Sequence, residues 1–272
     1  MAPVKPQSPE AMLEKLRLEP KHSWGQNFLG DDGVLEAIAD EVAVGPGDVV
    51  VELGAGLGHL TAHLVATGAK VVAVERDREL VPVLESQGGF TVLAANAAEL
   101  DFAKAGGVSE VVVAGNLPYH LSSSILFEVI AQRASVKRAV FLLQQEVVTR
   151  IVAGPGGRDT GLLSVLLGLW FEARECFQVG RSQFHPPPKV DSAVLRLDRR
   201  PKPLAEVDGK RFELVVKAAF AHRRKTLKNS LQSHPELKDK DLAGALQRAN
   251  IDGMRRAETL SIVEFAALTN CL

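Results

Sequence analysis

The chain has 272 residues, of which 46% are apolar and 24% are charged, enough for a full core and for one large domain with a smaller one. No run approaches 18 uninterrupted apolar residues, and the charged, proline-containing N-terminal stretch lacks the apolar segment of a signal peptide. Only Cys176 and Cys271 occur, too few for a disulfide framework or a cysteine metal cluster. We therefore expect a cytoplasmic protein without a membrane span.

The net charge of −1 is unevenly distributed along the chain. Residues 1–198 contain 17 Lys and Arg against 24 Asp and Glu, whereas residues 199–272 contain 15 against 9. A basic C-terminal segment suggests contact with a polyanion. On charge alone, an ordinary Lys/Arg-rich helical surface is the simpler interpretation.

Residues 1–20 are expected to form an extension with one short helix, in which Pro9 suits the first turn. Strands then alternate with helices, a pattern that predicts an α/β fold with a mostly parallel, doubly wound sheet. The expected strands cover 49–53, 70–75, 91–95, 110–115, 138–143, 171–177 and 190–197. The first expected helix follows the strand 49–53 and its turn, and ends near residue 66. The other expected helices of this part cover about 77–86, 122–131, 144–153 and 161–169. The last two strands have no long helix between them, so the final one should run antiparallel near one edge.

After a proline-containing linker at 199–203 the pattern becomes all-helical. The expected helices cover about 209–220, 223–232, 239–249 and 261–270. Ser261, followed three residues later by Glu264, is a capping-box signal for the last of them. We expect an extension over 1–20, a sheet domain over 21–200 and a smaller all-α domain over 201–272.

A glycine-rich turn, Gly54-Ala55-Gly56-Leu57-Gly58, follows the first expected strand and opens a helix. Glycines let the backbone pass close to a ligand. The dinucleotide fingerprint needs a different glycine spacing, and position 59 here is His. Glu52, just before the turn, would place negative charge where it repels a pyrophosphate but tolerates a cationic methionine group. The turn therefore fits S-adenosylmethionine better than NAD.

Two more strand ends carry polar side chains. Glu75 ends the second strand, 21 residues after Gly54, and its carboxylate could accept both ribose hydroxyls of the cofactor. Asn96 follows the third strand and could accept a hydrogen bond from the cofactor's adenine amine. Taken singly, Glu75 is equally well a solvated strand-end acid, and Asn96 is typical of a turn.

Asn116-Leu117-Pro118-Tyr119 stands at the carboxyl end of the fourth strand, where open α/β sheets bind ligands. It offers an amide side chain, a backbone carbonyl followed by a proline that has no N–H, and an aromatic ring. An exocyclic amine on a flat base needs acceptors for its N–H groups and a surface for its ring. Phe184 could supply the opposite surface. The alternative is a plain strand-end turn with Tyr119 packed in the core.

Basic residues gather at the expected start of a C-terminal helix, in His222-Arg223-Arg224-Lys225-Thr226-Leu227-Lys228. Such a cluster suits phosphate contacts, whose affinity falls with salt. Lys189 ends a stiff proline segment and could reach a phosphate, or could belong to a structural loop only. The histidines show no metal-ligand spacing, so no metal is expected.

Seven ordered segments make this chain similar to the KsgA-type small-subunit (16S) rRNA adenine N6,N6-dimethyltransferase family. They are GQNFL (25–29), VELGAGLGHLT (51–61), VAVERD (72–77), AGNLPYHLSS (114–123), LLQQEVVTRI (142–151), FHPPPKVDSAVLRL (184–197) and FAHRRKTLKNSL (220–231). The resemblance runs from about residue 23 to 231. It implies a Rossmann-like class I methyltransferase sheet followed by a helical RNA-binding domain.

The resemblance also implies roles for individual residues. Asn27 and Leu29 would cover the methionine end of the cofactor, and Gly54 and Gly56 would lie in the turn beside it. Glu75 would hold its ribose, and Asn96 would face its adenine. Asn116 would lie between the cofactor and the target base and contact both. Asn96 departs from the Asp usual in the family; it keeps an acceptor oxygen and loses a charge.

The implied reaction is dimethylation, by S-adenosylmethionine, of two adjacent adenines in the 3′-terminal hairpin loop of 16S rRNA in the small ribosomal subunit. A monomer would contact this RNA through Arg223, Arg224, Lys225 and Lys228. The related macrolide-resistance enzymes of large-subunit rRNA typically lack a segment like 220–231. A non-catalytic assembly factor on the same fold is disfavoured by the intact Gly54, Glu75 and Asn116. A DNA or small-molecule methyltransferase is disfavoured by the basic helical domain.

Overall fold

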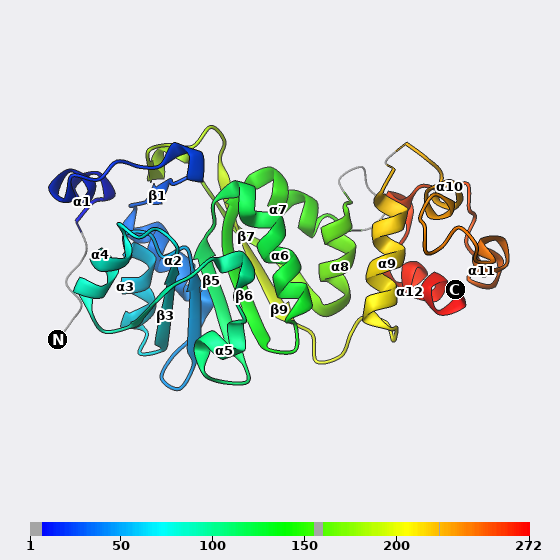
Figure 1. Ribbon diagram of the computed structural model, residues 1–272, viewed down its shortest axis with the longest axis horizontal. Helices are drawn as coiled ribbons and strands as arrows, with labels where there is room; N and C mark the ends of the chain where they lie inside the picture. Colours follow the sequence, from blue (N-terminus) through cyan, green and yellow to red (C-terminus); the bar gives the residue numbers. More distant parts are fainter. Residues whose placement is uncertain (1–6, 155–159, 223) are drawn as a thin grey trace. The chain divides into compact units, whose positions relative to one another are not determined.

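The computed structural model describes residues 7–154, 160–222 and 224–272. By its internal contacts the chain divides into two compact units, each built from two stretches of sequence (Figure 1). The first unit contains the chain up to Val148 together with Arg174–Arg199. The second contains Thr149–Ala173 and Arg200–Leu272.

A seven-stranded sheet with the order β4-β3-β2-β5-β6-β9-β7 forms the centre of the first unit. Its strands are β2 (Val49–Leu53), β3 (Lys70–Glu75), β4 (Thr91–Ala94), β5 (Val111–Asn116), β6 (Val136–Gln144), β7 (Phe171–Val179) and β9 (Ser192–Arg199). The strands from β2 to β6 pair in parallel, and β9 runs antiparallel to β6. The predicted parallel sheet with a reversed last strand is confirmed, although β9 lies inside the sheet and β7 is the edge strand.

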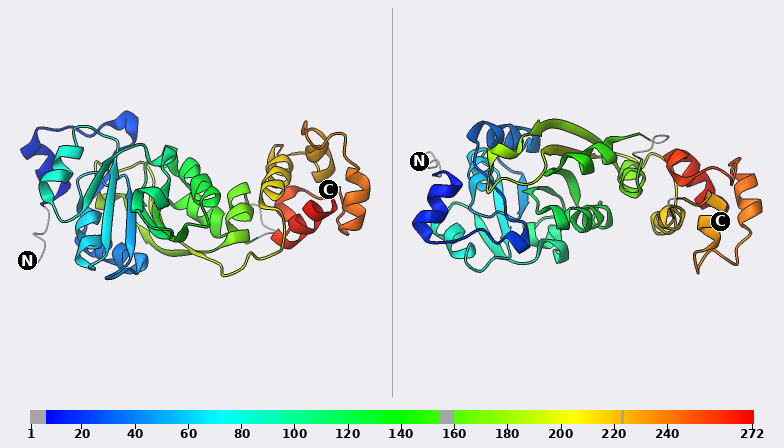
Figure 2. Two further views of the ribbon diagram at one scale, coloured as in Figure 1. Left: turned by 60° about the horizontal axis from the view of Figure 1, so that its bottom comes forward. Right: turned by 90° about the horizontal axis from the view of Figure 1, so that it is seen from above.

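Helices cover both faces of this sheet, as Figure 2 shows from above. On one face α2 (Asp32–Val42) and α3 (His59–Ala66) share a buried cluster with alternate strand residues such as Val50, Val112 and Val140. On the other face lie α5 (Phe102–Gly106) and α6 (Ser122–Ala131), with the fully buried side chains of Phe102 and Ile125. Burial on both faces explains the continuous valine runs of the central strands.

The N-terminal part contains α1 (Pro9–Leu16), which begins at Pro9 after an N-cap serine, as expected. A separate two-stranded sheet pairs β1 (Phe28–Leu29) with β8 (Phe184–His185). The unit also contains α4 (Val81–Gln87) and the beginning of α7 (Gln145–Val152). The motifs did not predict β1, β8, α2 or α5. The signal for α2 was present, because Leu35, Ile38, Ala39 and Val42 are buried at helical spacing.

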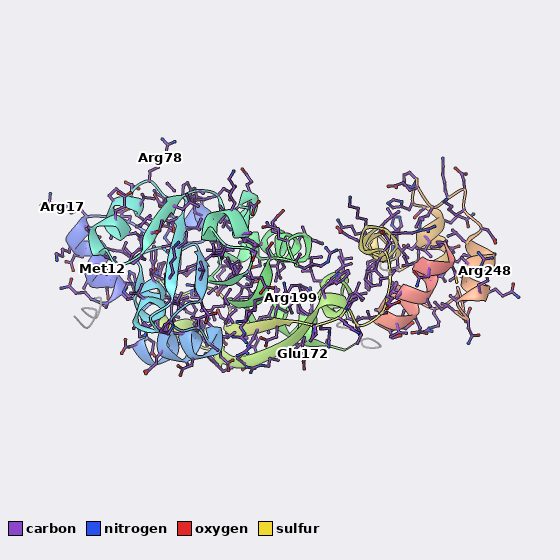
Figure 3. All side chains as sticks on the ribbon, turned by 90° about the horizontal axis from the view of Figure 1, so that it is seen from below. Met12, Arg17, Arg78, Glu172, Arg199 and Arg248 are labelled. Atoms are coloured by element: carbon purple, nitrogen blue, oxygen red, sulfur yellow. The ribbon has the colours of Figure 1, made fainter. Side chains whose placement is uncertain are left out.

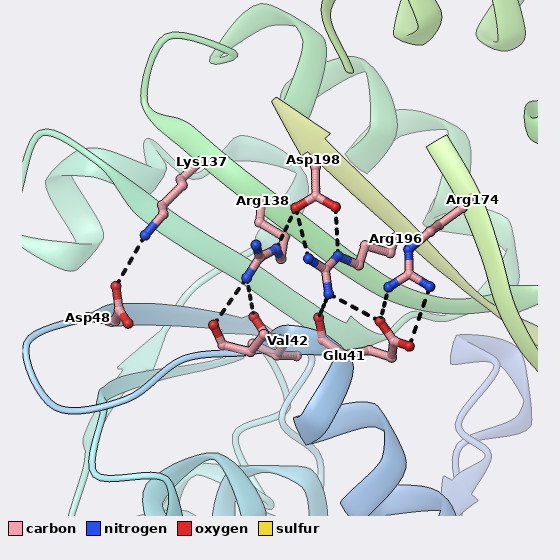
Figure 4. A network of polar contacts seen from close by, with 9 residues as sticks. Glu41, Val42, Asp48, Lys137, Arg138, Arg174, Arg196 and Asp198 are labelled. Carbon is pink, nitrogen blue, oxygen red and sulfur yellow. Dashed lines mark hydrogen bonds and ion pairs between the residues drawn. The ribbon is translucent and has the colours of Figure 1, made fainter. Parts of the chain in front are cut away.

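Two arginines secure the C-terminal end of α2 on the sheet (Figure 4). Arg138 donates to the carbonyl oxygens of Val42 and Ala43 at 3.0 and 3.1 Å. Arg196 donates to the carbonyl oxygen of Glu41 at 3.0 Å. The last carbonyls of a helix have no partner within the helix, so these guanidinium groups satisfy acceptors that would otherwise need water.

The second unit is helical. Its helices are α8 (Leu162–Trp170), α9 (Gly209–Phe220), α10 (Leu227–Gln232), α11 (Leu242–Arg248) and α12 (Ile262–Cys271), with the end of α7. The capping box at the start of α12 is confirmed, with Glu264 N donating to Ser261 Oγ at 3.1 Å and Ser261 N to Glu264 Oε2 at 2.7 Å.

The segment 149–173 belongs to the second unit, so the division by contacts differs from a single boundary near residue 200. Gly168 of α8 lies so close to Ile262 of α12 that an added Cβ would come within 2.6 Å of the isoleucine Cδ1. Arg200 N also donates to Trp170 O at 2.9 Å. The apolar pattern of α8 predicts a buried helix but does not reveal which helices bury it. Within the described residues, no helix has the length and hydropathy needed to cross a membrane.

Candidate active site

A cavity lies at the carboxyl ends of β2, β3 and β5, entirely within the first unit. Its lining includes all residues expected to bind cofactor or act on the base: Asn27, Leu29, Gly54, Gly56, Glu75, Asn96, Asn116, Leu117, Pro118, Tyr119 and Phe184. Parallel strands end at one edge of the sheet, which brings these separate segments together.

The glycine-rich turn forms the floor of this cavity. Gly54 and Gly56 have φ angles of +72° and +59°, a region that glycine adopts without strain. A Cβ at Gly56 would lie 3.2 Å from the ring of Phe28. Gly54 N donates to Val74 O at 2.9 Å, which holds the turn against β3. Glycine at these two positions therefore allows the tight turn that borders the cavity.

Glu75 is buried at the end of β3, with 7% of its surface exposed. Its Oε1 accepts hydrogen bonds from the backbone N–H groups of Arg76 and Asp77, both at 2.8 Å, and its Oε2 accepts one from Gly56 at 2.9 Å. Burial raises the pKa of this carboxyl, while the three N–H donors oppose the rise. Oε1 already accepts two hydrogen bonds and Oε2 accepts one, so a further donor would be accepted mainly by Oε2.

Asn96 caps a short 3₁₀ helix at the end of β4. Its Oδ1 accepts from Ala98 N at 3.2 Å, and its Nδ2 donates to Glu99 Oε1 at 2.7 Å. The turn-forming interpretation of Asn96 is therefore confirmed, and the residue also borders the cavity. Because Glu99 engages the amide nitrogen, Oδ1 is the atom that remains able to accept a further hydrogen bond.

Glu52 differs from the expectation of a charged group. It is 1% exposed and accepts a hydrogen bond from Thr61 Oγ1 at 2.6 Å. Burial raises the pKa of this carboxyl to about 8, with a further contribution from the negative charge of Glu75. Burial therefore favours the protonated form of Glu52 over the charged form that the sequence suggested.

Asn116 ends β5, and its amide orientation is determined by a neighbouring carbonyl. Its Nδ2 donates to Asn27 O at 3.0 Å. A carbonyl oxygen only accepts, so the amide nitrogen must face it and Oδ1 remains an acceptor. Gly115 before it has no room for a side chain, since a Cβ would overlap the Leu53 carbonyl oxygen. The strand can approach β2 this closely only with glycine.

The next residues supply a second acceptor. Pro118 O accepts from Leu121 N at 2.9 Å, whereas no donor to the Leu117 carbonyl is found among the described residues. The Tyr119 ring is partly exposed, and its hydroxyl shares a hydrogen bond of 2.8 Å with Ser192 Oγ. Burial raises the pKa of Tyr119, so the phenol stays neutral. Phe184 is 5% exposed and lies opposite Leu29 in the β1–β8 pair.

The family model for ribosomal RNA adenine dimethylases matches residues 17–268. The chain belongs to this family. Ribosomal RNA small subunit methyltransferase A of Myxococcus xanthus (strain DK1622) is 56% identical over 270 residues, 98% of this chain and 95% of that protein. The protein of the same name from Anaeromyxobacter sp. (strain K) is 50% identical over 97% of this chain and 98% of its own length. The protein is thus an rRNA adenine dimethyltransferase, as its motifs predicted.

Solved structures support the fold. A crystal structure of 23S rRNA methyltransferase ErmE matches with a TM-score of 0.68 and 26% identity, covering 90% of this chain and 99% of that one. A dimethyladenosine transferase from Plasmodium falciparum matches with a TM-score of 0.73 and 24% identity, covering 89% and 95%. The first unit therefore has the expected class I methyltransferase sheet, and the C-terminal part is helical.

One group of cavity residues in this dimethyltransferase was not predicted: Trp24, Gln26 and Arg76. The guanidinium carbon of Arg76 lies 4.0 Å from the centroid of the Trp24 ring, and Lys21 Nζ lies 5.0 Å from it. Such cation–π geometry is favourable. The available signal was positional, since Trp24 directly precedes GQNFL and Arg76 directly follows Glu75.

The residues expected on RNA are exposed where they are described. Lys189 belongs to the first unit, and Arg224, Lys225 and Lys228 belong to the second. Arg223 lies outside the described residues. Backbone bonds from Leu227 N to Arg255 O and from Lys228 N to Gly253 O secure the start of α10. Within the described part of the chain, no group of three or more His, Cys, Asp or Glu residues is placed to hold a metal ion.

Proposed function

We propose that this enzyme transfers methyl groups from S-adenosylmethionine to the N6 amines of two adjacent adenines in the 3′-terminal hairpin loop of 16S rRNA. Its target would be the small ribosomal subunit, where it would act as a cytoplasmic monomer. The observation that carries the proposal is the Asn116 amide, whose oxygen remains an acceptor at the cavity because its nitrogen is held by Asn27. The small-subunit names of the closely similar relatives support this choice of RNA.

The cavity residues fit S-adenosylmethionine. Glu75 Oε2 would accept from the ribose, Asn96 Oδ1 from the adenine amine, and the turn at Gly54 and Gly56 would allow close backbone approach. Asn27 and Leu29 would cover the methionine end. When bound, this cofactor supplies an electrophilic methyl group on a positively charged sulfur. Burial of Glu52, which also lines the cavity, favours its protonated form, and that form adds no fixed charge beside the cofactor.

The chain's part in the reaction is to position the amine. An adenine N6 lone pair is delocalised into the ring, so the amine needs orientation more than a strong base. Asn116 Oδ1 and the Leu117 carbonyl would accept its two N–H groups and direct the lone pair toward the methyl group. The same acceptors bind more strongly as the nitrogen becomes cationic, which favours the transition state over the ground state.

Aromatic surfaces would hold the base. Tyr119 would stack on one side, and Phe184, although mostly buried, borders the cavity from β8. A base must leave its stack to enter such a pocket, which is easiest from a loop. Pro118 restricts the backbone between Asn116 and Tyr119, and its fixed φ helps to hold the Leu117 carbonyl in one orientation. The phosphates of the RNA would be contacted by a separate set of basic residues. These are the exposed Lys189, Arg224, Lys225 and Lys228, together with Arg223.

The test is a methylation assay with labelled cofactor and three acceptors: unmethylated 30S particles, 50S particles and DNA. We expect label in 30S particles alone, at two adjacent adenines. We expect Asn116→Ala to abolish transfer while its circular dichroism and much of its cofactor affinity persist. Label in 50S particles would instead support the large-subunit reaction named for the solved structure at 26% identity. Wild-type turnover by Asn116→Ala would overturn the mechanism.

A further inference from the structure

One segment of the first unit touches the cofactor side and the base side of the cavity. We call residues 21–29, between α1 and α2, the N-terminal strap. The strap includes Trp24, Gln26 and Asn27, all of which line the cavity. The strap begins at Lys21, which we call its near end, and it finishes in β1, which we call its far end.

The near end of the strap is fastened to Asp77, which follows β3 and is 2% exposed. Lys21 Nζ donates to Asp77 Oδ1 at 2.6 Å, and Gln26 Nε2 donates to Asp77 Oδ2 at 2.8 Å. Gln26 Oε1 in turn accepts from Lys21 N at 2.8 Å, which closes a ring of contacts. Burial favours a raised pKa for Asp77, but the hydrogen bonds from Lys21, Glu79 N and Gln26 outweigh it and the pKa is lowered. The carboxylate is therefore charged when it holds the strap.

Asp77 also belongs to the loop that organises Glu75. Its backbone N–H donates to Glu75 Oε1 at 2.8 Å. Arg76, between the two acids, packs its guanidinium on Trp24 of the strap. The residue that fastens the strap is therefore built into the same turn as the expected ribose acceptor.

The other contacts of the strap are on the base side. Asn27, next to Gln26, supplies the carbonyl oxygen that receives the Asn116 amide at 3.0 Å. Leu29 pairs with Phe184, and Gly30 N donates to Gln183 O at 3.1 Å just beyond. Moving the strap would release the amide of Asn116 and shift the backbone that carries Phe184.

We propose that Asp77 is a positioning residue for methyl transfer. It acts through Gln26 on the Asn27 carbonyl, and so couples the cofactor turn at Glu75 to the acceptor oxygen of Asn116. The inference rests on the proposed role of Asn116. A displacement of about 1 Å at a reacting centre costs as much as a hundredfold in rate, so loosening the strap lowers kcat more than cofactor affinity. A carboxylate that only stabilised its own loop would change stability or cofactor affinity and leave kcat at saturation unaltered.

The experiment compares Asp77→Asn, Gln26→Glu and the double variant that combines them. Asp77→Asn removes the charge, and Gln26→Glu alone sets two carboxylates against each other. In the double variant the amide at position 77 can donate to the carboxylate at position 26, so the hydrogen bond is restored with donor and acceptor exchanged. Arg78→Gln is the matched control, because Arg78 lies in the same loop, is exposed and points away from the ribbon (Figure 3). The readouts are cofactor Kd by calorimetry and kcat on unmethylated 30S particles at saturating cofactor.

We expect each single variant to lose roughly tenfold in kcat with a smaller change in cofactor Kd, and the double variant to recover most of that loss. Arg78→Gln should match the wild type. Unchanged kcat in both single variants, or a double variant no better than the worse single one, would overturn the proposal. Wild type and Asn116→Ala are assayed alongside. If the wild type fails to methylate 30S particles, the proposed function fails instead; if Asn116→Ala turns over normally, the proposed role of Asn116 fails.

Discussion

The side-chain amide of Asn116 donates to the backbone carbonyl of Asn27 at 3.0 Å, although the two residues are 89 positions apart. This contact determines which end of the amide is left as an acceptor. It also makes the orientation of Asn116 depend on a segment that contributes no strand to the central sheet. The presence of the right residue in the tetrapeptide is therefore not sufficient for catalysis.

Asn116→Asp keeps the acceptor oxygen at this position but removes the amide nitrogen that orients it, so the variant tests the two features separately. The aspartate keeps an acceptor oxygen but places a second oxygen against the Asn27 carbonyl, where neither atom can donate. We expect kcat to fall at least about tenfold, because the acceptor is no longer oriented, while cofactor Kd changes little. Steady-state assays with 30S particles at saturating cofactor, and calorimetry with the cofactor, measure the two quantities. Full activity of Asn116→Asp would show that the amide nitrogen has no role.

Glu75 and Asn96 should contribute unequally to cofactor binding. Glu75 is buried and would meet the ribose, whereas Asn96 is partly exposed and already serves as a cap. We expect Glu75→Ala to weaken cofactor binding more than Asn96→Ala. Calorimetry of both variants gives the order, and the reverse order would contradict this ranking.

Glu75→Ala should also lower stability. It would leave the N–H groups of Gly56, Arg76 and Asp77 without their acceptor. A buried unsatisfied donor costs about 1–3 kcal/mol, although water can enter and reduce this. Urea denaturation of the cofactor-free protein checks this loss, with Asn96→Ala as the control that should lose less.

The sheet and most of the cavity were predictable from sequence because their signals are local. Valine runs, the glycine turn and the Asn116-Leu117-Pro118-Tyr119 segment each carry their own pattern. Parallel pairing then places the strand ends at one edge without further information. The charge state of Glu52 was not predictable in this way, because it depends on the packing of α3 against β2.

The strap was also beyond the local patterns. Gln26 and Asp77 are 51 positions apart, and nothing in either segment alone indicates that they meet. The membership of 149–173 in the helical unit depends likewise on a distant partner, Ile262. A pattern within one segment does not indicate which distant segment it will contact, so these contacts could not be predicted from the motifs.

The contact of Arg138 with the last carbonyls of α2 leads to a prediction about stability. Arg138 is largely buried, with 17% of its side chain exposed, and it also donates to Asp198 at 2.6 Å. We expect Arg138→Met to lose about 1–3 kcal/mol of unfolding free energy, since it leaves the Asp198 charge and two carbonyls less satisfied. Arg174→Met is the control in the same network, because that side chain is 48% exposed where it pairs with Glu41. Exposed pairs contribute about 0–1 kcal/mol, so equal losses in urea denaturation would contradict this account.

The basic segment predicts a salt-dependent RNA affinity. If Lys225 and Lys228 each neutralise a phosphate, replacing either by Gln should weaken binding to 30S particles and lower the slope of log affinity against log salt by about 0.7–0.9. Lys240→Gln is the control, because Lys240 is an exposed lysine of the same unit outside this segment. Filter binding across a salt series measures the slopes. An unchanged slope for both variants would favour an ordinary solvated helix surface.

Glu52 should make stability depend on pH. In the folded protein its carboxyl keeps a proton up to a pKa of about 8, whereas in the unfolded chain it ionises near 4.5. The folded state therefore binds more protons between these values, and stability falls as pH rises from 4.5 toward 8 and then levels off. Glu52→Gln removes this titration, and the Gln oxygen can still accept from Thr61.

We therefore expect the unfolding free energy of Glu52→Gln to rise relative to the wild type by up to about 1.4 kcal/mol per pH unit within this window. Urea denaturation of both proteins at about pH 6, 7 and 8 measures the difference directly, because all other titrating groups are shared. Parallel pH profiles would show that Glu52 is already ionised in the folded protein at neutral pH. In that case the turn would present a negative charge to the cofactor, as the sequence alone predicted.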